Sequence, residues 1–134
     1  MCSSDLPSAR VEIPSRAPDH RVTYQTSPDQ ALIYRLSGGR NPLHSDPSFA
    51  AMGGFDRPIL HGLCTYGFTG RALLHTLCGG DPGRFKSMAG RFSKPVYPGD
   101  ALTISMWVDG SQCVFQTTNP AGEVVLDQGQ MTFA

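Results

Sequence analysis

Three features that often reveal a protein's partners are missing from this sequence. Lysine and arginine number 11, as do aspartate and glutamate, so the formal net charge is zero and no nucleic acid or membrane surface is implied as a partner. The longest apolar runs fall far short of the roughly 20 residues that span a bilayer. The four cysteines (Cys2, Cys64, Cys78 and Cys113) show no close pairing, which argues against a disulfide framework. We therefore expect reduced thiols and a cytoplasmic location.

The length of 134 residues suits one domain. Residues 7–18 are rich in proline, serine and charge and predict a linker, so we expect an N-terminal linker or artefactual segment over residues 1–20 and a folded domain over 21–134. Met1 to Leu6 resemble the translated end of a common sequencing adapter, and one hypothesis is that the reading frame begins at a truncated contig. An ordinary disordered terminus is the alternative, and resequencing the locus separates the two.

The apolar periodicity changes from helical to strand-like along the chain. A long helix is predicted over residues 59–77, where apolar side chains recur every three or four positions. Beyond Arg84 the period becomes two, which indicates a meander of strands. The strands are expected over 85–96, 101–109, 112–118 and 123–133, and the shorter elements are a strand over 21–26 and helices over 27–36 and 48–52. One helix followed by a meander of strands favours an α+β fold.

Two finer expectations concern packing. We expect Gly67 to lie at a close contact between the helix and the sheet, since a glycine inside a helix costs about 1 kcal/mol relative to alanine and needs a reason. Strand 101–109 carries two alternating sets of side chains, which should face opposite sides of the sheet. One set is Leu102, Ile104, Met106 and Val108, and the other is Thr103, Ser105 and Trp107. A sheet packed on one helix keeps open edges, which predicts pairing with a second sheet.

A polar loop between the short helices holds the residues best suited to chemistry. Its sequence is Ser37-Gly38-Gly39-Arg40-Asn41-Pro42-Leu43-His44, and its glycines and proline fix the backbone. His44 is a candidate for proton transfer because imidazole titrates near neutral pH, although a lone loop histidine is more often structural. Asn41 can form a turn, orient a water molecule, or do both. Gly62, at the start of the long helix, has a backbone N–H placed to stabilise an oxyanion.

Three segments in this order resemble the MaoC-like, or type 2, (R)-specific enoyl-CoA hydratases. They are the loop just described, Pro58-Ile59-Leu60-His61-Gly62, and Arg91-Phe92-Ser93-Lys94-Pro95-Val96-Tyr97-Pro98-Gly99-Asp100. The resemblance covers about residue 26 to the C-terminus and implies a hotdog fold, in which an antiparallel sheet wraps a long central helix. It also implies reversible hydration of a trans-2-enoyl-CoA to the (3R)-3-hydroxyacyl-CoA, with no cofactor beyond the substrate's CoA. A homodimer or a hotdog heteromer is the implied assembly.

The resemblance also implies roles for single residues. His44 matches a histidine that shares one water molecule with an aspartate five residues earlier, and that aspartate falls on Gly39. Gly62 matches the donor to the thioester carbonyl, and Arg40 and Phe92 match substrate-binding positions, although a strand aromatic such as Phe92 is more often a core residue. Loss of a general base typically costs about 10²–10⁴ in rate. Two hypotheses follow: a weakened hydratase, or a non-catalytic acyl-CoA-binding subunit of a heteromeric hydratase.

Other polar residues carry less weight. His44, Asp46 and His61 fall short of the three or four closely spaced ligands of a metal site, so we expect no metal. Four cations surround the strand that begins at residue 85 (Arg84, Lys86, Arg91 and Lys94), and one or two could meet CoA phosphates, although most such charges are simply solvated.

In two-hotdog members of the family a linker like residues 7–18 leads into the catalytic half, so a preceding hotdog could be missing from this chain.

Overall fold

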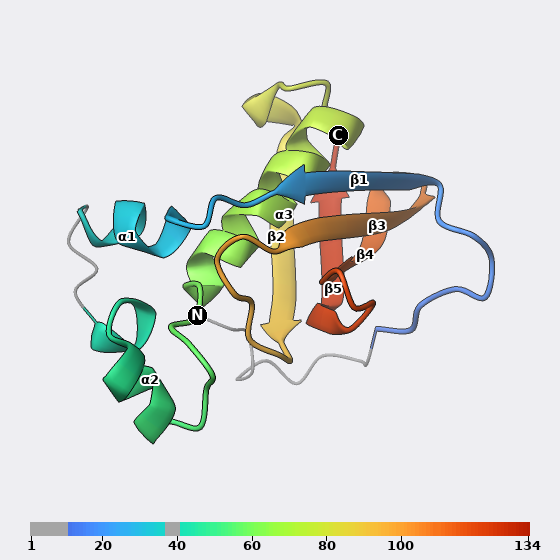
Figure 1. Cartoon of the computed structure of the whole chain (residues 1–134). Coiled ribbons are helices and arrows are strands. Elements are labelled where there is room, and N and C mark those ends of the chain that lie inside the picture. The colour runs from blue at the N-terminus through green and yellow to red at the C-terminus, as the bar shows by residue number, and fades with distance from the viewer. Residues whose placement is uncertain (1–10, 37–40) are drawn as a thin grey trace.

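The computed structural model describes residues 11–36 and 41–134, so the expectations for residues 1–6, Gly39 and Arg40 lie outside the described residues. Figure 1 shows one long helix crossing behind a strongly twisted sheet, with two short helices projecting to one side. In chain order the elements are β1 (His20–Gln25), α1 (Gln30–Arg35), η1 (Pro42–His44), α2 (Pro47–Met52), α3 (Gly62–Leu77), η2 (Pro82–Arg84), β2 (Phe85–Phe92), β3 (Ala101–Asp109), β4 (Gln112–Thr118) and β5 (Val124–Phe133).

The five strands form a single antiparallel sheet in the order β1-β3-β4-β5-β2. Strands β3, β4 and β5 follow one another as a meander, and β1 and β2 occupy the two edges. The α+β architecture is confirmed, as are the bounds of β3 and β4, because alternating apolar residues and the turns beyond Asp109 and Thr118 were visible in the sequence.

The core lies between α3 and the concave face of the sheet. Ala72 and Leu73 of the helix are fully buried, as are Ile104, Phe115 and Leu126 of the sheet. One polar bridge crosses this core: the hydroxyls of Thr69 and Thr117 are 2.6 Å apart and both residues are fully buried. Pairing the two hydroxyls satisfies polar atoms that would otherwise destabilise an apolar interior.

Helix α3 and strand β2 are shorter than the sequence predicted, as is α1, which spans Gln30–Arg35 instead of 27–36. Helix α3 begins at Gly62 and not at Ile59, because the backbone is extended at His61 (ψ 136°) and the N–H groups of Ile59 and Leu60 bond the carbonyls of Leu43 and Val96. Strand β2 ends at Phe92 and not at Val96, since the chain turns away towards Leu60. In both places apolar residues continue the periodic pattern, but tertiary hydrogen bonds set the element's end.

The expected contact at Gly67 is wrong. A Cβ atom built on Gly67 would meet no atom within 4 Å, and the residue is exposed on the face of α3 that points away from the sheet. Gly70 does face β2, where the Met88 sulfur lies 3.5 Å from the position of a Cβ. A leucine at position 67 would therefore not overpack this core.

The face of β3 that carries Trp107 is covered by the segment preceding β1. Trp107 is 6 % exposed, and its indole N–H donates to the Arg16 carbonyl at 2.8 Å. Asp19 accepts a hydrogen bond from the Val108 N–H at 2.7 Å and pairs with the Arg16 guanidinium at 2.8 Å. The alternation predicted for β3 is present, but residues 16–19 bury part of its second face.

One extra residue in β5 produces a bulge beside the core. Thr117 of β4 pairs with Leu126 of β5, and Phe115 pairs with Gly129. Between these two pairs β4 has one residue, Gln116, whereas β5 has two, Asp127 and Gln128. Gln128 adopts a positive φ of 52°. The next residue, Gly129, lies directly opposite Phe115, and a Cβ on it would overlap the Phe115 carbonyl oxygen and ring. Only glycine fits there without a shift of the backbone.

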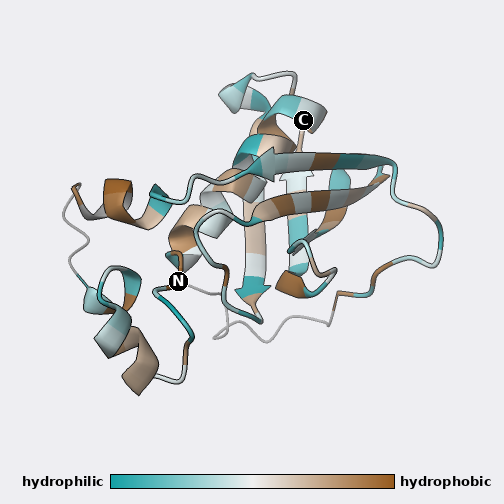
Figure 2. Ribbon diagram, in the orientation of Figure 1, coloured by the Kyte–Doolittle hydropathy of each residue, from teal (hydrophilic) through white to brown (hydrophobic). Residues whose placement is uncertain are grey.

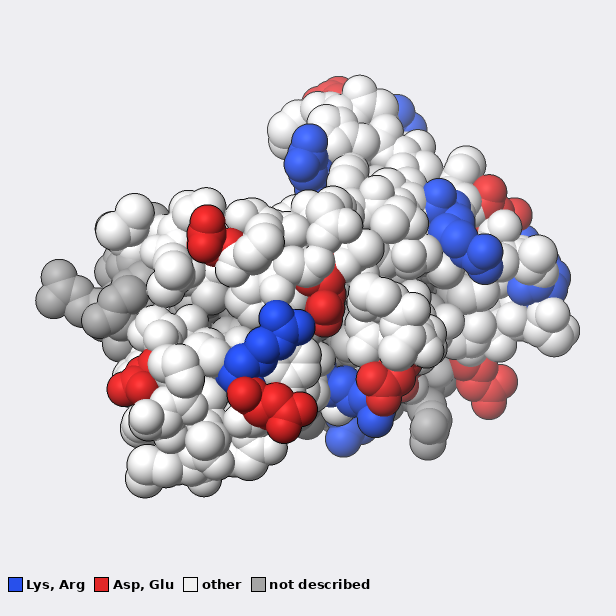
Figure 3. Space-filling view, viewed as in Figure 1, with Lys and Arg blue, Asp and Glu red and all other residues white. Residues whose placement is uncertain are grey.

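The described surface does not gather charge of one sign on the face seen in Figure 3, where lysine and arginine alternate with aspartate and glutamate. Within residues 11–36 and 41–134, no helix is long and apolar enough to cross a membrane.

Candidate active site

The loop expected to carry the chemistry is held by its own side chains. Asn41 precedes η1, and its Oδ1 accepts a hydrogen bond from the Leu43 N–H at 3.0 Å, which confirms the turn-forming role. The turn uses one lone pair of Oδ1, so any orientation of a water molecule would fall to the second lone pair or to the amide nitrogen. Asp46 caps α2 through the N–H of Ser48 at 2.9 Å, so this carboxylate belongs to the next helix.

His44 is fixed by a backbone carbonyl from the segment that leads into α3. Its Nδ1 lies 2.8 Å from the Ile59 carbonyl oxygen. A carbonyl oxygen only accepts, so Nδ1 carries the proton and the neutral ring presents its lone pair at Nε2. The half-buried side chain thus has one nitrogen committed to structure and the other suited to holding a water molecule.

A second histidine lies flat against His44. The two rings of His44 and His61 have centroids 3.7 Å apart and planes 21° apart, the geometry of a stacked pair. Burial lowers the pKa of His61, and the charge that His44 can carry lowers it further. His61 is therefore uncharged at neutral pH.

Gly62 begins α3 directly after this pair. The first N–H groups of a helix lack intrahelical partners, and the helix dipole adds partial positive charge there, so this turn favours a negative oxygen. The ring of Phe92 lies against Gly62, 3.2 Å from the position that a Cβ would take. Tyr66 meets the same ring edge-on at 6.3 Å and donates its hydroxyl to the Met88 carbonyl at 2.8 Å. Phe92 is 41 % exposed, so it covers the helix start and does not enter the core.

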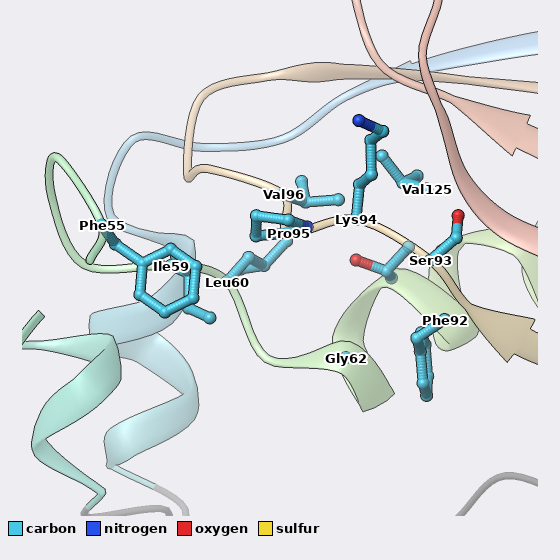
Figure 4. Close-up of a pocket in the computed structure, with 11 residues that line it drawn as sticks. Phe55, Ile59, Leu60, Gly62, Phe92, Ser93, Lys94, Pro95, Val96 and Val125 are labelled. Atoms are coloured by element: carbon cyan, nitrogen blue, oxygen red, sulfur yellow. The ribbon is translucent and has the colours of Figure 1, made fainter. Parts of the chain in front are cut away.

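A cavity of about 390 Å³ opens beside Gly62. Figure 4 shows the ring of Phe92 beside the first turn of α3, and Lys94 extending away from Gly62. The lining is mostly apolar and comes from the segment before α3, from α3 itself and from the strand ends: Phe55, Ile59, Leu60, Gly62, Thr65, Phe92, Ser93, Lys94, Pro95, Val96 and Val125. Such a lining with few polar groups is typical of a ligand pocket.

The described site residues are thus brought together in part. Gly62 and Phe92 line one cavity, and His44 reaches their neighbourhood through its contact with His61. His44 is not among the residues that line this cavity, and the expectation that His44 and Gly62 face one cavity stays a prediction. Sequence reasoning missed the His61 ring, because a stack between positions 44 and 61 has no signature in residue spacing.

The basic cluster does not stay together in space. Arg84 donates to the Ala134 carbonyl and Lys86 to the Gly83 carbonyl, at the end of β2 remote from Gly62. Lys94 lines the cavity and lies 3.3 Å from the carboxylate of Glu123. Of these cations, Lys94 is therefore the one placed to meet a charged group of a ligand entering this cavity.

The thiols of Cys64 and Cys113 are poorly suited to nucleophilic chemistry. Burial raises the pKa of Cys64, and it raises the pKa of Cys113 to about 11, so both thiols stay protonated at neutral pH. Among the described residues, no three histidine, cysteine or acidic side chains cluster as metal ligands would.

A long helix on a five-stranded antiparallel sheet, with a fixed histidine next to a glycine helix start, defines a hotdog-fold domain with a candidate thioester site. The chain belongs to the MaoC-like domain family, whose model matches residues 10–130. An (R)-hydratase structure from A. caviae, 23 % identical, superposes with a TM-score of 0.68 over 87 % of this chain and 93 % of its own, which confirms the expected fold.

Nearer relatives are about half identical to this chain. It is 50 % identical to 3-hydroxyacyl-thioester dehydratase Y of Mycobacterium tuberculosis, over 93 % of this chain and 46 % of that protein. It is 51 % identical to the peroxisomal enoyl-CoA hydratase 2 of Arabidopsis thaliana, over 80 % and 35 %. A crystal structure of a MaoC-like dehydratase from Phytophthora capsici matches with a TM-score of 0.91 and 46 % identity, over 95 % of this chain and 44 % of that one. The chain therefore spans less than half the length of these relatives.

Proposed function

We propose that this domain hydrates trans-2-enoyl-CoA thioesters to (3R)-3-hydroxyacyl-CoA, reversibly and without a further cofactor. The observation that carries the proposal is the spacing of two groups along one fixed backbone: Ile59 holds His44 by its carbonyl at 2.8 Å, and Gly62 starts α3 three residues later. Hydro-lyase activity in half-identical relatives supports the same reaction class.

In the proposed reaction, water adds across the double bond in two linked steps. The oxygen of a water molecule held by Nε2 of His44 bonds to the β-carbon while one O–H bond of that water breaks and its proton passes to Nε2. The electron pair of the double bond moves towards the thioester and leaves negative charge on its oxygen, which the N–H of Gly62 stabilises. The α-carbon then takes the proton from Nε2, and the thioester carbonyl re-forms. One water molecule is consumed, with its hydroxyl on the β-carbon and a hydrogen on the α-carbon, and dehydration is the reverse.

The cavity supports a thioester with a flexible apolar or pantetheine arm. Its volume of about 390 Å³ and its apolar lining suit such a chain, with Phe92 closing over the helix start. We assign Gly62, Phe92 and Arg40 to substrate binding, and His44 and Asn41 to the reacting water. Lys94 is added as a contact for CoA phosphate, in exchange for its pairing with Glu123.

Gly39 decides how active the domain is. A carboxylate at this position would accept the proton of the attacking water, so its replacement by glycine predicts weakened hydration. Gly39→Asp should raise turnover by roughly 10²-fold or more, the scale of a restored general base. The measurement is hydration of crotonyl-CoA and of a longer enoyl-CoA by the unmodified protein and by Gly39→Asp. Strong activity in the unmodified protein would show that another group replaces the aspartate.

The second candidate function is a binding subunit without chemistry of its own, favoured by the glycine at position 39. In that case a partner hotdog would carry an intact aspartate and histidine. The same assay, repeated with each protein mixed with a hotdog encoded by a neighbouring reading frame, separates the two. No gain from Gly39→Asp, with or without that partner, favours the binding subunit.

We also propose that the domain pairs with a second hotdog, as a homodimer or a heteromer. Its edge strands leave backbone groups open for pairing, and Figure 2 shows hydrophobic stretches in the projecting helices α1 and α2. The large apolar side chains exposed on or directly after these helices, each at least 43 % exposed, are Leu32, Ile33, Leu36, Phe49 and Met52. Light scattering at micromolar concentration tests this, and a monomer mass for the isolated chain would leave only the heteromer.

Free thiols at Cys64, Cys78 and Cys113 support a cytoplasmic location.

A further inference from the structure

His61 is the N-cap residue of α3, but its side chain does not cap the helix. It precedes α3 with φ −61° and ψ 136°, the place where serine, threonine, aspartate or asparagine usually caps a helix. Its ring makes no hydrogen bond to the first turn of α3, all of whose residues are described. The ring instead turns back and stacks on His44, and the residue is 9 % exposed.

The stack restricts the one motion of His44 that its hydrogen bond leaves open. A bond from Nδ1 to the Ile59 carbonyl fixes one ring atom, but the imidazole can still rotate about the line through that bond. Contact over the whole ring face, with centroids 3.7 Å apart and planes at 21°, opposes this rotation. The two contacts together fix where Nε2 of His44 points.

Both contacts come from one short piece of chain. Ile59 supplies the carbonyl, His61 supplies the ring, and Gly62 supplies the N–H at the helix start. The piece is itself anchored on both sides, since the N–H of Ile59 bonds the Leu43 carbonyl at 3.3 Å and the N–H of Leu60 bonds that of Val96 at 2.6 Å. The position of Nε2 relative to the helix start is therefore set by a few covalently linked residues.

We propose that His61 is a positioning residue for the hydration reaction, acting through its stack on His44. The planar ring aims Nε2 at the water molecule to be added, at a fixed distance from the oxyanion donor of Gly62. This inference rests on the proposed function for its catalytic consequence, whereas the effect of His61 on the His44 ring does not depend on turnover. A misplacement near 1 Å can cost on the order of 10²-fold in rate. Loss of the His61 stack should therefore lower kcat more than it weakens substrate binding.

The test compares His61→Leu with His61→Phe, both made in the Gly39→Asp protein. Leucine keeps apolar bulk but has no planar face, whereas phenylalanine keeps the face and loses both nitrogens. We expect His61→Leu to lower kcat roughly tenfold or more with little change in KM, the pattern of a lost transition-state orientation. The loss in His61→Phe should be clearly smaller. His75, exposed in the last turn of α3, supplies the matched control through His75→Leu and His75→Phe, which should equal each other.

A second readout needs no turnover. Nitrogen-15 spectra of the His44 ring should report the Nδ1-protonated tautomer in the parent and in His61→Phe, and a mixture of tautomers in His61→Leu. Equal kcat values for the two variants at equal melting temperature, with an unchanged His44 tautomer, would overturn the proposal. Should His61→Leu not fold, His61→Gln takes its place with the same expected and contrary results. If none of the proteins hydrates enoyl-CoA, the proposed function fails, and the tautomer spectra alone decide whether His61 positions His44.

Discussion

The two ends of helix α3 are built for different purposes. Towards the C-terminal end Ala72 and Leu73 are fully buried and Leu77 is 8 % exposed, all against the sheet. At the N-terminal end Gly62 is exposed and Leu63 is 65 % exposed, beside a cavity. The buried end contributes apolar packing to the free energy of unfolding, whereas Gly62 and Leu63 contribute little packing and lie where the helix presents its first backbone N–H groups.

The largest effect should come from the buried end. Leu73→Ala removes a fully buried side chain and should lower the free energy of unfolding by about 2–5 kcal/mol, because it loses apolar burial and leaves a cavity. Leu63→Ala, in the same helix, is the matched control and should change it by less than about 0.5 kcal/mol. Urea denaturation measures both. Similar losses at the two positions would contradict the division, and would point to a partner surface over Leu63.

The exposed end should respond in turnover and not in stability. Gly62→Pro deletes one N–H at the first helical position, where proline is well tolerated, and the ψ of 136° at His61 suits a residue before proline. Turnover of the Gly39→Asp protein should fall by roughly 10²–10³, as for loss of an oxyanion donor.

Gly62→Ala is the control for this experiment. It keeps the N–H but adds a Cβ 3.2 Å from the Phe92 ring, which is partly exposed and can shift. Steady-state kinetics should place it well above Gly62→Pro. Equal losses in the two variants would assign the effect to the Phe92 contact and not to the backbone donor.

The middle of the helix offers a smaller, stabilising change. Because a Cβ on Gly67 meets nothing within 4 Å, Gly67→Ala should raise the free energy of unfolding by about 0.5–1 kcal/mol through helix propensity alone. Thermal unfolding at matched concentration measures it. A loss of stability would show that another chain packs closely on this face of α3 in solution.

The smallest effect is a slope with pH. The pKa of His61 is lowered on folding, so below its ordinary value near 6.5 the unfolded chain binds a proton that the folded chain does not. More protons on the unfolded state mean that stability falls as the pH drops below about 6.5. His61→Phe should flatten this part of the profile, measured by urea denaturation between pH 7.5 and 5. A steeper profile in the variant would contradict the lowered pKa.

The sheet was more predictable from sequence than the site. Strand β3 could be read correctly because a period of two residues has a single structural interpretation over nine positions. The start of α3 could not, because Ile59 and Leu60 fit the helical pattern, and only hydrogen bonds to Leu43 and Val96 exclude them. Gly67 was misjudged since propensity shows that a glycine is costly but not which way it faces.

Within the site, the residues found from sequence are those that follow a local rule. Asn41 was recognised as a turn former because an asparagine before a proline-containing turn bonds its own backbone two residues on. The role of the Ile59 carbonyl and the His61 ring depends on two distant segments meeting, which residue spacing does not encode.

The bulge at Gln128 and Gly129 has a consequence for how the chain finds its fold. Gly129 is the residue of β5 that can lie opposite Phe115, since any side chain there meets the Phe115 carbonyl and ring. A slip of β5 by one residue would bring Gln128 or Gln130 to that place and also turn Met131 out of the core. The missing side chain therefore selects one register for β5, because any other residue opposite Phe115 would place its Cβ against the Phe115 carbonyl and ring.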